Sequence, residues 1–399
     1  MKNILLVSMS APPQKGAESI QVGRYLKHLN DAFNIELITS NTPKHSWARE
    51  DNSILKGILV KNRVELNAYK GRRTDRVLNI MTSSTPEERF VNYFEEALAQ
   101  IKFKPDLIYS RALPHASTLL AKKIKEHFKV PWVMHLSDPW EDNTFIENIK
   151  GEHIVENACV NLASKVTLTS ELAVQFYKNK YPLHKEKFTF MPNVYEEDIV
   201  IEDDYTNNCE HLTITHTGNF YGKRNPQVIL QVLAQLSKKN KLQNIKFWFA
   251  GEMDETSKRL FKKYDIPEIE LLGGISFKES IELQQKSDIL LIIDKEYEKP
   301  ADLTTLPSKL LDYCATTKPI LAITPKGSST DIFINKYGVG KSFQHNQIKE
   351  IKDYIESLIN TFNNNEKFEP YQPPLHYGAN YNAKRLIKVF NQLIKIPIT

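Results

Sequence analysis

Cysteine and long apolar runs are both scarce in this sequence. The 399 residues include only Cys159, Cys209 and Cys314, an odd and widely spaced set. Such a set argues against a disulfide framework and a zinc cluster, and it favours a reducing compartment. No stretch reaches the roughly 18 apolar residues that a membrane-crossing helix needs. The N-terminal apolar run, residues 4–7, is shorter than the roughly 7 to 15 residues of a signal-peptide core. We therefore expect a cytoplasmic protein, and we leave open an association with the inner face of the membrane.

Excess charge and fingerprint glycines are also missing. Lys and Arg number 53 and Asp and Glu 48, and the resulting net charge of +5 permits anionic partners without demanding nucleic acid. No G-x-G-x-x-G pattern occurs, which makes an NAD-dependent oxidoreductase a poor candidate. The hydrophobic share of 41% and the charged share of 25% are those of a globular protein. A chain of this length exceeds what one hydrophobic core usually supports, so we expect two domains.

Apolar strand-like runs alternate with helical patterns along the first half of the chain. The runs lack a period of two, as is typical of sheets buried on both faces, and their alternation with helices indicates parallel β-α-β units. We expect strands at residues 3–8, 34–39, 57–64, 106–110, 132–136 and 165–169, and helices at 20–29, 87–101 and 117–128. The pattern predicts a doubly wound α/β domain.

The same alternation restarts after a polar, acidic stretch that lacks any apolar period. We expect strands at residues 213–217, 246–250, 270–272, 289–293 and 319–324, helices at 226–236, 255–264 and 278–285, and a last helical pattern at 384–394. The predicted parts are a first Rossmann-like domain at residues 1–193, a linker at 194–210, a second such domain at 211–380, and a C-terminal helix at 381–399 that crosses back toward the first domain. Two such domains create a central cleft at the carboxyl ends of their sheets, so every loop after a strand is a candidate site.

The segment LPSKLLDYCATTKPILAIT, residues 306–324, carries the most functional information. It predicts a loop, a short helix with Lys309 and Asp312 near its start, and a buried strand. The first turn of a helix offers unpaired N–H groups and the positive end of the helix dipole to a diphosphate. Lys309 would add a cation, and Asp312 can accept hydrogen bonds from a ribose diol. The alternative is an ordinary amphipathic helix with Ser308 as its N-cap.

Two loops of the first domain carry further candidates. Gly16 precedes a helix, where a glycine allows the backbone to approach a ligand closely; the alternative is a plain loop capped by Ser19. His135 and Asp138 lie at the end of a strand in HLSDPW. His135 can bond a sugar hydroxyl, and Asp138 can act as a base toward an acceptor hydroxyl or hold it. Asp138 can also simply cap the turn before Pro139.

The second domain opens with ITHTGNFYGKRNP. Gly218 ends its first strand, and Lys223 and Arg224 precede the next helix, where two cations can clamp a diphosphate together with Lys309. Gly251 follows the next strand, where a small residue leaves room for a base or ribose.

A last feature combines basic and aromatic residues in the first domain. Its members are Lys70, Arg72, Arg73, Arg76, Met81, Phe90, Tyr93, Phe94, Lys102 and Lys104. This mixture suits an anionic membrane surface or a lipid-linked acceptor. The alternative is a solvated charge cluster beside a core-packed helix.

Taken together, these motifs resemble the GT-B fold glycosyltransferases, and within them glycosyltransferase family 4, which is rich in bacterial exopolysaccharide, capsule and lipopolysaccharide enzymes. The resemblance covers nearly the whole chain. It rests on PPQKGAES, HLSDPW, VTLTSEL, FMPN, HTGNFYGKRNP and LPSKLLDYCATTKPILAI. The last of these is similar to the family's P-S-K-x-x-E-Y-x-A-x-G-K-P-x-x-A donor motif.

The resemblance implies a retaining enzyme with an N-terminal acceptor-binding domain and a C-terminal donor domain. The donor would be a UDP- or GDP-sugar, with UDP favoured, and no metal or other cofactor is expected. Gly218, Lys223 and Arg224 would face the diphosphate, and Ser308 and Lys309 the phosphates or the sugar. Cations and helix N-termini would stabilise the departing diphosphate.

The remaining implied roles concern the ribose, the sugar and the acceptor. Asp312 would bind the ribose, Gly16 would lie against the donor sugar and phosphate, and His135 and Asp138 would lie near the reacting hydroxyl. The acceptor would be a glycan or a lipid-linked glycan.

The sequence departs from the family pattern at Thr304, where many members carry a Glu eight positions before the ribose-binding acid. Glu296, Glu298 and Asp302 are the candidates to replace it. Two alternatives to a transferase remain. One is a nucleotide-sugar epimerase on the same fold, and the other is a catalytically silent subunit that holds a glycan or a second transferase.

Overall fold

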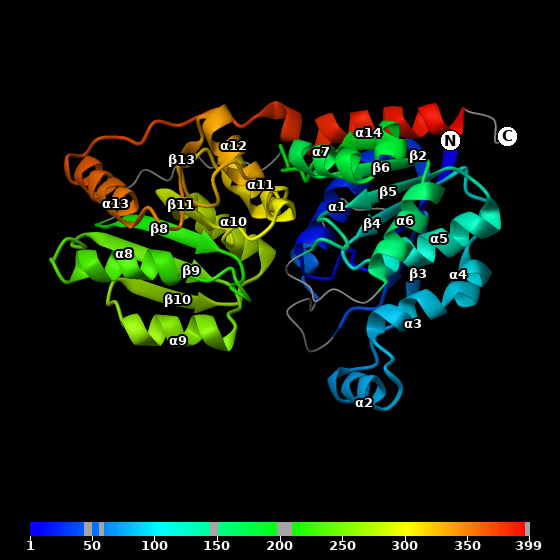
Figure 1. Cartoon of the computed structure of the whole chain (residues 1–399), viewed down its shortest axis with the longest axis horizontal. Helices are drawn as coiled ribbons and strands as arrows, with labels where there is room; N and C mark the ends of the chain where they lie inside the picture. The colour runs from blue at the N-terminus through cyan, green and yellow to red at the C-terminus, as the bar shows by residue number, and fades with distance from the viewer. Residues whose placement is uncertain (44–49, 56–59, 144–150, 198–209, 396–399) are drawn as a thin grey trace. The chain divides into compact units, whose positions relative to one another are not determined.

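The computed structural model describes residues 1–43, 50–55, 60–143, 151–197 and 210–395. The chain divides into two compact units, shown in Figure 1. The N-terminal unit comprises Met1–Glu196 and His376–Thr399, and the C-terminal unit comprises Glu197–Leu375. Each is described by itself below.

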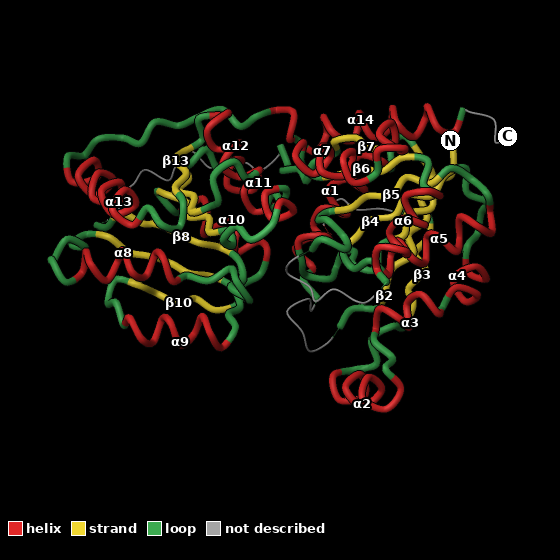
Figure 2. The backbone as a smooth tube through the Cα atoms, viewed as in Figure 1, coloured by secondary structure: helices red, strands yellow, loops and turns green. Residues whose placement is uncertain are grey.

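A parallel sheet of seven strands forms the centre of the N-terminal unit, in the order β3-β2-β1-β4-β5-β6-β7. The strands are β1 (Lys2–Val7), β2 (Phe33–Ser40), β3 (Asn62–Leu66), β4 (Leu107–Ala112), β5 (Trp132–Leu136), β6 (Lys165–Leu168) and β7 (Phe188–Phe190). The helices are α1 (Ala17–Leu29), α2 (Arg72–Thr82), α3 (Pro86–Asn92), α4 (Phe94–Gln100), α5 (Ala116–Phe128), α6 (Glu152–Leu162), α7 (Glu171–Lys180) and α14 (Ala379–Ile394). Figure 2 shows these helices packed around the sheet, except for α2, which stands away from it.

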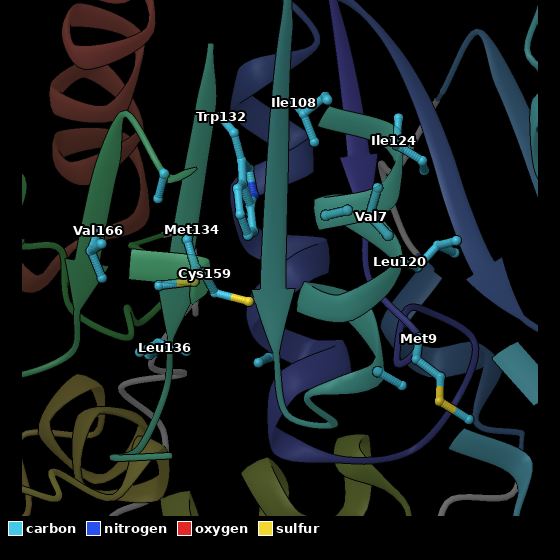
Figure 3. Packing of buried hydrophobic residues seen from close by; sticks show 14 of the residues in the cluster. Val7, Met9, Ile108, Leu120, Ile124, Trp132, Met134, Leu136, Cys159 and Val166 are labelled. Atoms are coloured by element: carbon cyan, nitrogen blue, oxygen red, sulfur yellow. The ribbon is translucent and has the colours of Figure 1, made fainter. Parts of the chain in front are cut away.

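The central strands are buried on both faces, which explains their continuous apolar runs. In β1, Ile4 packs in one hydrophobic cluster with residues of α1 and α14, whereas Val7 packs in a second cluster with residues of α5. Figure 3 shows the second cluster, in which Trp132 and Met134 of β5 lie beside Ile108 of β4. The carboxyl ends of these strands are thereby held in fixed register.

The C-terminal unit contains a second parallel sheet, of six strands in the order β10-β9-β8-β11-β12-β13. The strands are β8 (Leu212–Thr217), β9 (Ile245–Ala250), β10 (Ile269–Gly273), β11 (Ile289–Ile293), β12 (Ile320–Ile323) and β13 (Gly340–Phe343). The helices are α8 (Gln227–Ser237), α9 (Glu255–Tyr264), α10 (Phe277–Lys286), α11 (Ser308–Ala315), α12 (Ser329–Tyr337) and α13 (Ile348–Asn363). The predicted doubly wound α/β class, in two Rossmann-like domains, is confirmed.

The C-terminal helix α14 belongs to the N-terminal unit. Leu386 and Phe390 pack in the same cluster as residues of α1. The chain enters this helix beside Tyr195, whose N–H donates to Tyr377 O at 3.1 Å and whose carbonyl accepts from the N–H of Ala379 at 2.9 Å. The N-terminal unit thus begins again at His376, a few residues before the boundary expected at residue 380. The predicted linker lies mostly outside the described residues.

Several predicted elements differ from the structure. The single helix expected at residues 87–101 is two helices, α3 and α4, which meet at Tyr93. The strand expected at residues 57–64 is β3, Asn62–Leu66, and residues 57–59 lie outside the described chain. No helix in the described part is long and apolar enough to cross a membrane.

Candidate functional site

The candidate site of the C-terminal unit begins at Gly218, directly after β8. Its N–H donates to Ala250 O at 2.7 Å, and its φ of +136° lies in the region that favours glycine. A Cβ built on Gly218 would collide with the side-chain ammonium of Lys309. The lysine therefore lies directly against a backbone position that only glycine leaves open.

Lys309 reaches this position from the first turn of α11, where Pro307 is the N-cap. Its Nζ lies 3.4 Å from Nε2 of the buried His216. The other ring nitrogen of His216, Nδ1, lies 2.9 Å from the carbonyl of Leu291, so we assign the proton to Nδ1. Burial and the neighbouring Lys309 hold the pKa of His216 well below its usual range. A neutral His216 therefore offers Nε2 as an acceptor for the ammonium.

Arg224 is the second cation of this site. It closes a tight turn in which Tyr221 and Arg224 exchange backbone hydrogen bonds of 3.2 and 3.1 Å. Burial, followed by the charge of Arg224, lowers the pKa of Lys309 to about 7, and Asp294 opposes this shift. Two cations that destabilise each other are a natural receptor for an anion, because a diphosphate would relieve their repulsion.

Lys223 does not join this pair. Its side chain is 60% exposed and forms an ion pair with Glu298. It also lines a hollow of about 190 Å³ together with Glu296 and His345. Of the two neighbouring cations that the sequence offered for a diphosphate clamp, the structure brings only Arg224 close to Lys309.

The loop between β11 and α11 is held by a buried ion pair. Lys295 Nζ lies 2.8 Å from Asp302 Oδ1, with side chains 4% and 1% exposed. Asp302 also accepts from the N–H groups of Glu298 and Lys299, each at 2.9 Å. Thr304 is buried, and its hydroxyl donates to Ala301 O at 2.7 Å. Neither Asp302 nor Thr304 presents its polar atoms to a ligand, whereas Glu296 faces the hollow.

The remaining predicted donor residues have mixed environments. Ser308 is the first residue of α11 and is half-buried, and Asp312 one turn later is largely buried. Gly251 has a φ of +142°, and a Cβ there would collide with the carbonyl of Gly218. Gly251 therefore allows the ends of β8 and β9 to pack together, a structural requirement that the sequence did not reveal.

A second polar cluster lies at the carboxyl edge of the sheet in the N-terminal unit. Arg111 of β4 forms a buried ion pair with Glu18 of α1, with Nε 2.7 Å from Oε1. Ser137 donates a short hydrogen bond to the other oxygen of Glu18. Burial raises the pKa of Glu18, Arg111 opposes this shift, and the charge of Asp138 adds to it. Asp138 is half-buried, and its effect on the pKa of Glu18 shows that it lies close to this pair.

His135 lies within the sheet beneath this cluster. Its ring is fully buried, and Nδ1 lies 2.9 Å from the hydroxyl of Thr167 on the neighbouring strand. Burial and Arg111 hold its pKa well below the usual range, so the ring is neutral. Among the described residues Nε2 has no hydrogen-bond partner. The ring has no exposed surface and bonds to the neighbouring strand, which indicates a structural role at the end of β5, three residues before Asp138.

Gly16 is the N-cap of α1, with a φ of +152°. The loop before it is fixed by Gln14, whose amide donates to the carbonyls of Met9 and Ser40, both at 3.0 Å. Gly16, where we predicted that the backbone approaches a ligand closely, therefore follows an ordered loop. This loop lies at the same edge of the sheet as Asp138.

Sequence reasoning missed four residues of these clusters: His216, Asp294, Glu18 and Arg111. His216 and Arg111 occur inside strands, where a polar residue in an apolar run was the available signal. No group of side chains within the described ranges has the composition of a metal site.

Comparison with known protein families gives one match. Residues 201–373 match the model of the family described as Glycosyl transferases group 1. The matched segment contains Gly218, Arg224 and Lys309. Among curated proteins none matches the sequence significantly.

Solved structures share the fold over nearly the whole chain. Sucrose-phosphate synthase from Thermosynechococcus elongatus has a TM-score of 0.65 at 13% identity, with 99% of this chain and 96% of that chain covered. A lipopolysaccharide outer core galactosyltransferase has a TM-score of 0.62 at 14% identity, with coverage of 98% and 100%. UDP-GlcNAc 2-epimerase from Neisseria meningitidis, bound to UDP-GlcNAc, has a TM-score of 0.63 at 13% identity, also with coverage of 98% and 100%. These similarities show the fold, and the expected GT-B class is confirmed.

Proposed function

We propose that this protein is a retaining glycosyltransferase. It would move a sugar from a UDP- or GDP-sugar to a glycan or lipid-linked glycan in the synthesis of a bacterial surface polysaccharide. One observation carries the proposal: the ammonium of Lys309 lies against Gly218, and Arg224 is close enough for its charge to lower the pKa of Lys309. The family match over the C-terminal unit supports sugar transfer. The similarity to an epimerase bound to UDP-GlcNAc supports a UDP-sugar as the donor. The similarity to a lipopolysaccharide galactosyltransferase supports a role in the synthesis of a surface polysaccharide.

The chemistry of the departing group explains why these cations matter. Cleavage of the bond between sugar and diphosphate leaves negative charge on the diphosphate, and preorganised cations lower the energy of that state. Arg224 can bond two oxygens at once, whereas Lys309 acts as a point charge. The N–H groups at the start of α11 add a third source of positive potential. In this proposal the side chains supply the stabilisation that a metal ion provides in other transferases.

Lys309 would take up a proton when the donor binds. With a pKa of about 7, only about half of the free protein carries this charge at pH 7. A diphosphate beside the amine favours the ammonium form, and His216 remains as an acceptor for one of its protons. The site would therefore be most strongly cationic when the diphosphate is present.

Asp138 is the proposed acceptor residue. It is half-buried at the carboxyl edge of its sheet, where a carboxylate can hold an acceptor hydroxyl or receive its proton. Glu18 and Arg111 fix the surrounding loop, and His135 acts as a positioning residue beneath it. Gly16 would lie against the donor. Glu296 is the best remaining candidate to contact the transferred sugar, because Asp302 and Thr304 are occupied within their own loop.

A nucleotide panel followed by turnover measurements tests the proposal. UDP, GDP and their sugars are added to the protein, and the preferred nucleotide is expected to raise Tm by a few degrees, since a ligand at 100 times its Kd adds about 2.7 kcal/mol. Transfer is then measured for Arg224→Ala and Lys309→Ala, with Lys326→Ala, an exposed lysine of the same unit, as the control. We expect at least a tenfold loss of kcat/KM in the first two variants only. Wild-type kinetics in both would refute the assignment.

A nucleotide-sugar epimerase is the second candidate, because the fold is similar to that of UDP-GlcNAc 2-epimerase. Incubation with the preferred UDP-sugar and no acceptor separates the two activities. A transferase leaves the sugar configuration unchanged in the proton NMR spectrum, whereas an epimerase converts it. Absence of any nucleotide binding would favour a silent binding subunit.

A further inference from the structure

Helix α2, Arg72–Thr82, is unlike every other α-helix described in the N-terminal unit. None of its residues is buried. Figure 1 shows it standing away from the rest of that unit, joined to it by the segments on both sides. A helix that buries no residue gains little stability from packing, so packing does not explain the apolar side chains of α2.

One side of α2 is tied to the unit. Asp75 forms an ion pair with Arg89 of α3, and the carboxylate also accepts from the N–H groups of Lys70 and Gly71, both at 3.1 Å. Arg89 in turn donates to Ala68 O at 2.8 Å. These bonds fix the direction in which the opposite side of the helix points.

The opposite side carries apolar and basic residues together. Val77, Ile80 and Met81 are 51%, 73% and 77% exposed. At about 100° per residue they lie well around the helix from Asp75, and the exposed Arg73 lies among them. The exposed Arg72 and Arg76 flank this face on one side, and Asp75 is the helix's one acidic residue.

The structure also corrects the composition of the basic and aromatic feature expected from the sequence. Phe90 is buried in the core, and Tyr93 and Phe94 pack against the same cluster. Lys102 and Lys104 precede β4 at the amino end of the sheet, whereas α2 follows the carboxyl end of β3. The aromatic residues are therefore structural, and the exposed apolar residues of α2 take their place.

We propose that α2 is a docking helix for an anionic lipid bilayer, with Val77, Ile80 and Met81 inserted at the level of the headgroups and Arg72, Arg73 and Arg76 bound to lipid phosphates. An amphipathic helix with arginines beside its apolar face is the form that binds in the plane of a membrane interface. Acidic lipids supply the complementary charge, and each arginine near such a surface strengthens binding about fivefold.

The size of the helix favours a membrane over a protein partner. Eleven residues span only about 16 Å, and three exposed apolar side chains cover far less than the roughly 1,000 Å² of a stable protein interface. A bilayer needs no matching surface. Because α2 leaves the sheet at its carboxyl edge, docking would place that edge, with Gly16 and Asp138, toward lipid-linked molecules. The docking itself does not depend on sugar transfer.

Co-sedimentation with vesicles tests the charged residues. The full chain is mixed with two kinds of phosphatidylcholine vesicle, one without acidic lipid and one with about one third phosphatidylglycerol. Each mixture is measured at low and at high salt. Binding is expected only with the acidic lipid and is weakened by salt. The variant Arg72→Gln, Arg73→Gln, Arg76→Gln should lose about a hundredfold in partition coefficient. The control Lys238→Gln, Lys239→Gln, Lys241→Gln removes the same charge from an exposed segment elsewhere and should bind like wild type.

Apolar insertion is tested by Ile80→Ser, Met81→Ser, with Leu183→Ser, Leu375→Ser as the matched control at side chains 88% and 75% exposed. We expect at least a tenfold loss for the first pair alone. All four residues are exposed, so we expect an unchanged Tm in each variant. A measured Tm equal to that of the wild type confirms that the variant is folded.

Three results would overturn the proposal: no binding of the wild type to acidic vesicles, equal losses in test and control variants, or binding that ignores the acidic lipid. A self-associating chain that becomes monomeric in Ile80→Ser, Met81→Ser, without vesicle binding, would assign the face to a second copy instead.

Discussion

The affinity for a nucleoside diphosphate should fall as the pH rises above 7. In the free protein, burial and the neighbouring Arg224 lower the pKa of Lys309 to about 7. The phosphate groups are already ionised above this pH, since their second pKa is near 6. The state of Lys309 then controls the charge of the site. Binding must draw a proton onto the amine, and each rise in pH makes that proton harder to obtain.

The size of the effect follows from the fraction of protonated lysine. About half of the Lys309 side chains are charged at pH 7 and about one in ten at pH 8. The affinity should therefore fall about fivefold between pH 7 and pH 8 and about tenfold for each further unit, until the pKa of the bound state is reached. Proton uptake should rise from about 0.5 to about 0.9 per bound nucleotide over the same interval.

Isothermal titration of UDP, or of GDP if it binds more tightly, measures both quantities when repeated in two buffers of different ionisation enthalpy. Arg224→Met should weaken binding and move the pH dependence upward, because the pKa of Lys309 rises once the like charge is gone. Lys326→Met, at an exposed position, should leave the profile unchanged. A constant affinity from pH 7 to pH 9 without proton uptake would refute the reasoning.

The same pKa predicts a stability effect with a defined sign. The unfolded lysine titrates near 10.4, so the unfolded state binds more protons than the folded state between about pH 7 and pH 10.4. The free energy of unfolding therefore contains a contribution from Lys309 that is unfavourable below pH 7 and fades as the pH rises through this window. Lys309→Met should be more stable than wild type by about 4–5 kcal/mol at pH 6, since each unit between the two pKa values is worth about 1.4 kcal/mol. Urea unfolding should show the gap closing by pH 10. An equal gap at both pH values would contradict the lowered pKa.

Three further substitutions separate the roles of neighbouring groups. Gly218→Ala should weaken nucleotide binding about tenfold in titrations, because the new methyl group displaces the ammonium of Lys309, and it should cost about 1–3 kcal/mol through backbone strain. Asp138→Asn should reduce transfer by about 10²-fold or more in a product assay while nucleotide binding stays within about twofold of wild type. Asp302→Asn should lower the free energy of unfolding in urea by about 3–5 kcal/mol, since Lys295 is left buried without its counter-charge.

Two matched variants serve as controls for these substitutions. Gly327→Ala introduces the same kind of strain, at a φ of +73° with open space around it, and should not change nucleotide affinity. Asp142 lies in the loop after Asp138 and forms an ion pair with Lys180. Asp142→Asn should therefore retain transfer. Loss of nucleotide binding in Asp138→Asn would assign that residue to structure, and an unchanged stability of Asp302→Asn would show that Lys295 reaches solvent.

Elements with largely apolar strands or strong capping were predictable from the sequence. The strands at Trp132–Leu136 and Ile289–Ile293 and the helix at Glu255–Tyr264 have the predicted bounds. Each combines a regular pattern with a clear end, such as the Asp254 side chain that accepts from Ser257 N–H at 2.8 Å. The short edge strands β7 and β13 were missed because they carry little periodic apolar signal. Helix α2 was missed because its charged residues were assigned to a basic and aromatic feature rather than to a helix.

The candidate site was predictable in its residue types but not in its pairing. Lys223 and Arg224 are adjacent in the sequence, yet the turn closed at Gly222, with a φ of +58°, leaves one with Glu298 and the other near Lys309. No local pattern contains that difference. Long-range contacts such as that between His216 and Lys309 arise from strand order, which the sequence suggests only as a class.

A crystal structure of the protein with the preferred nucleoside diphosphate tests the central claim most directly. The account predicts oxygens of the diphosphate within hydrogen-bond distance of Lys309 Nζ and of the Arg224 guanidinium, against the backbone of Gly218. A diphosphate bound elsewhere, with Lys309 still directed only at His216, would contradict it.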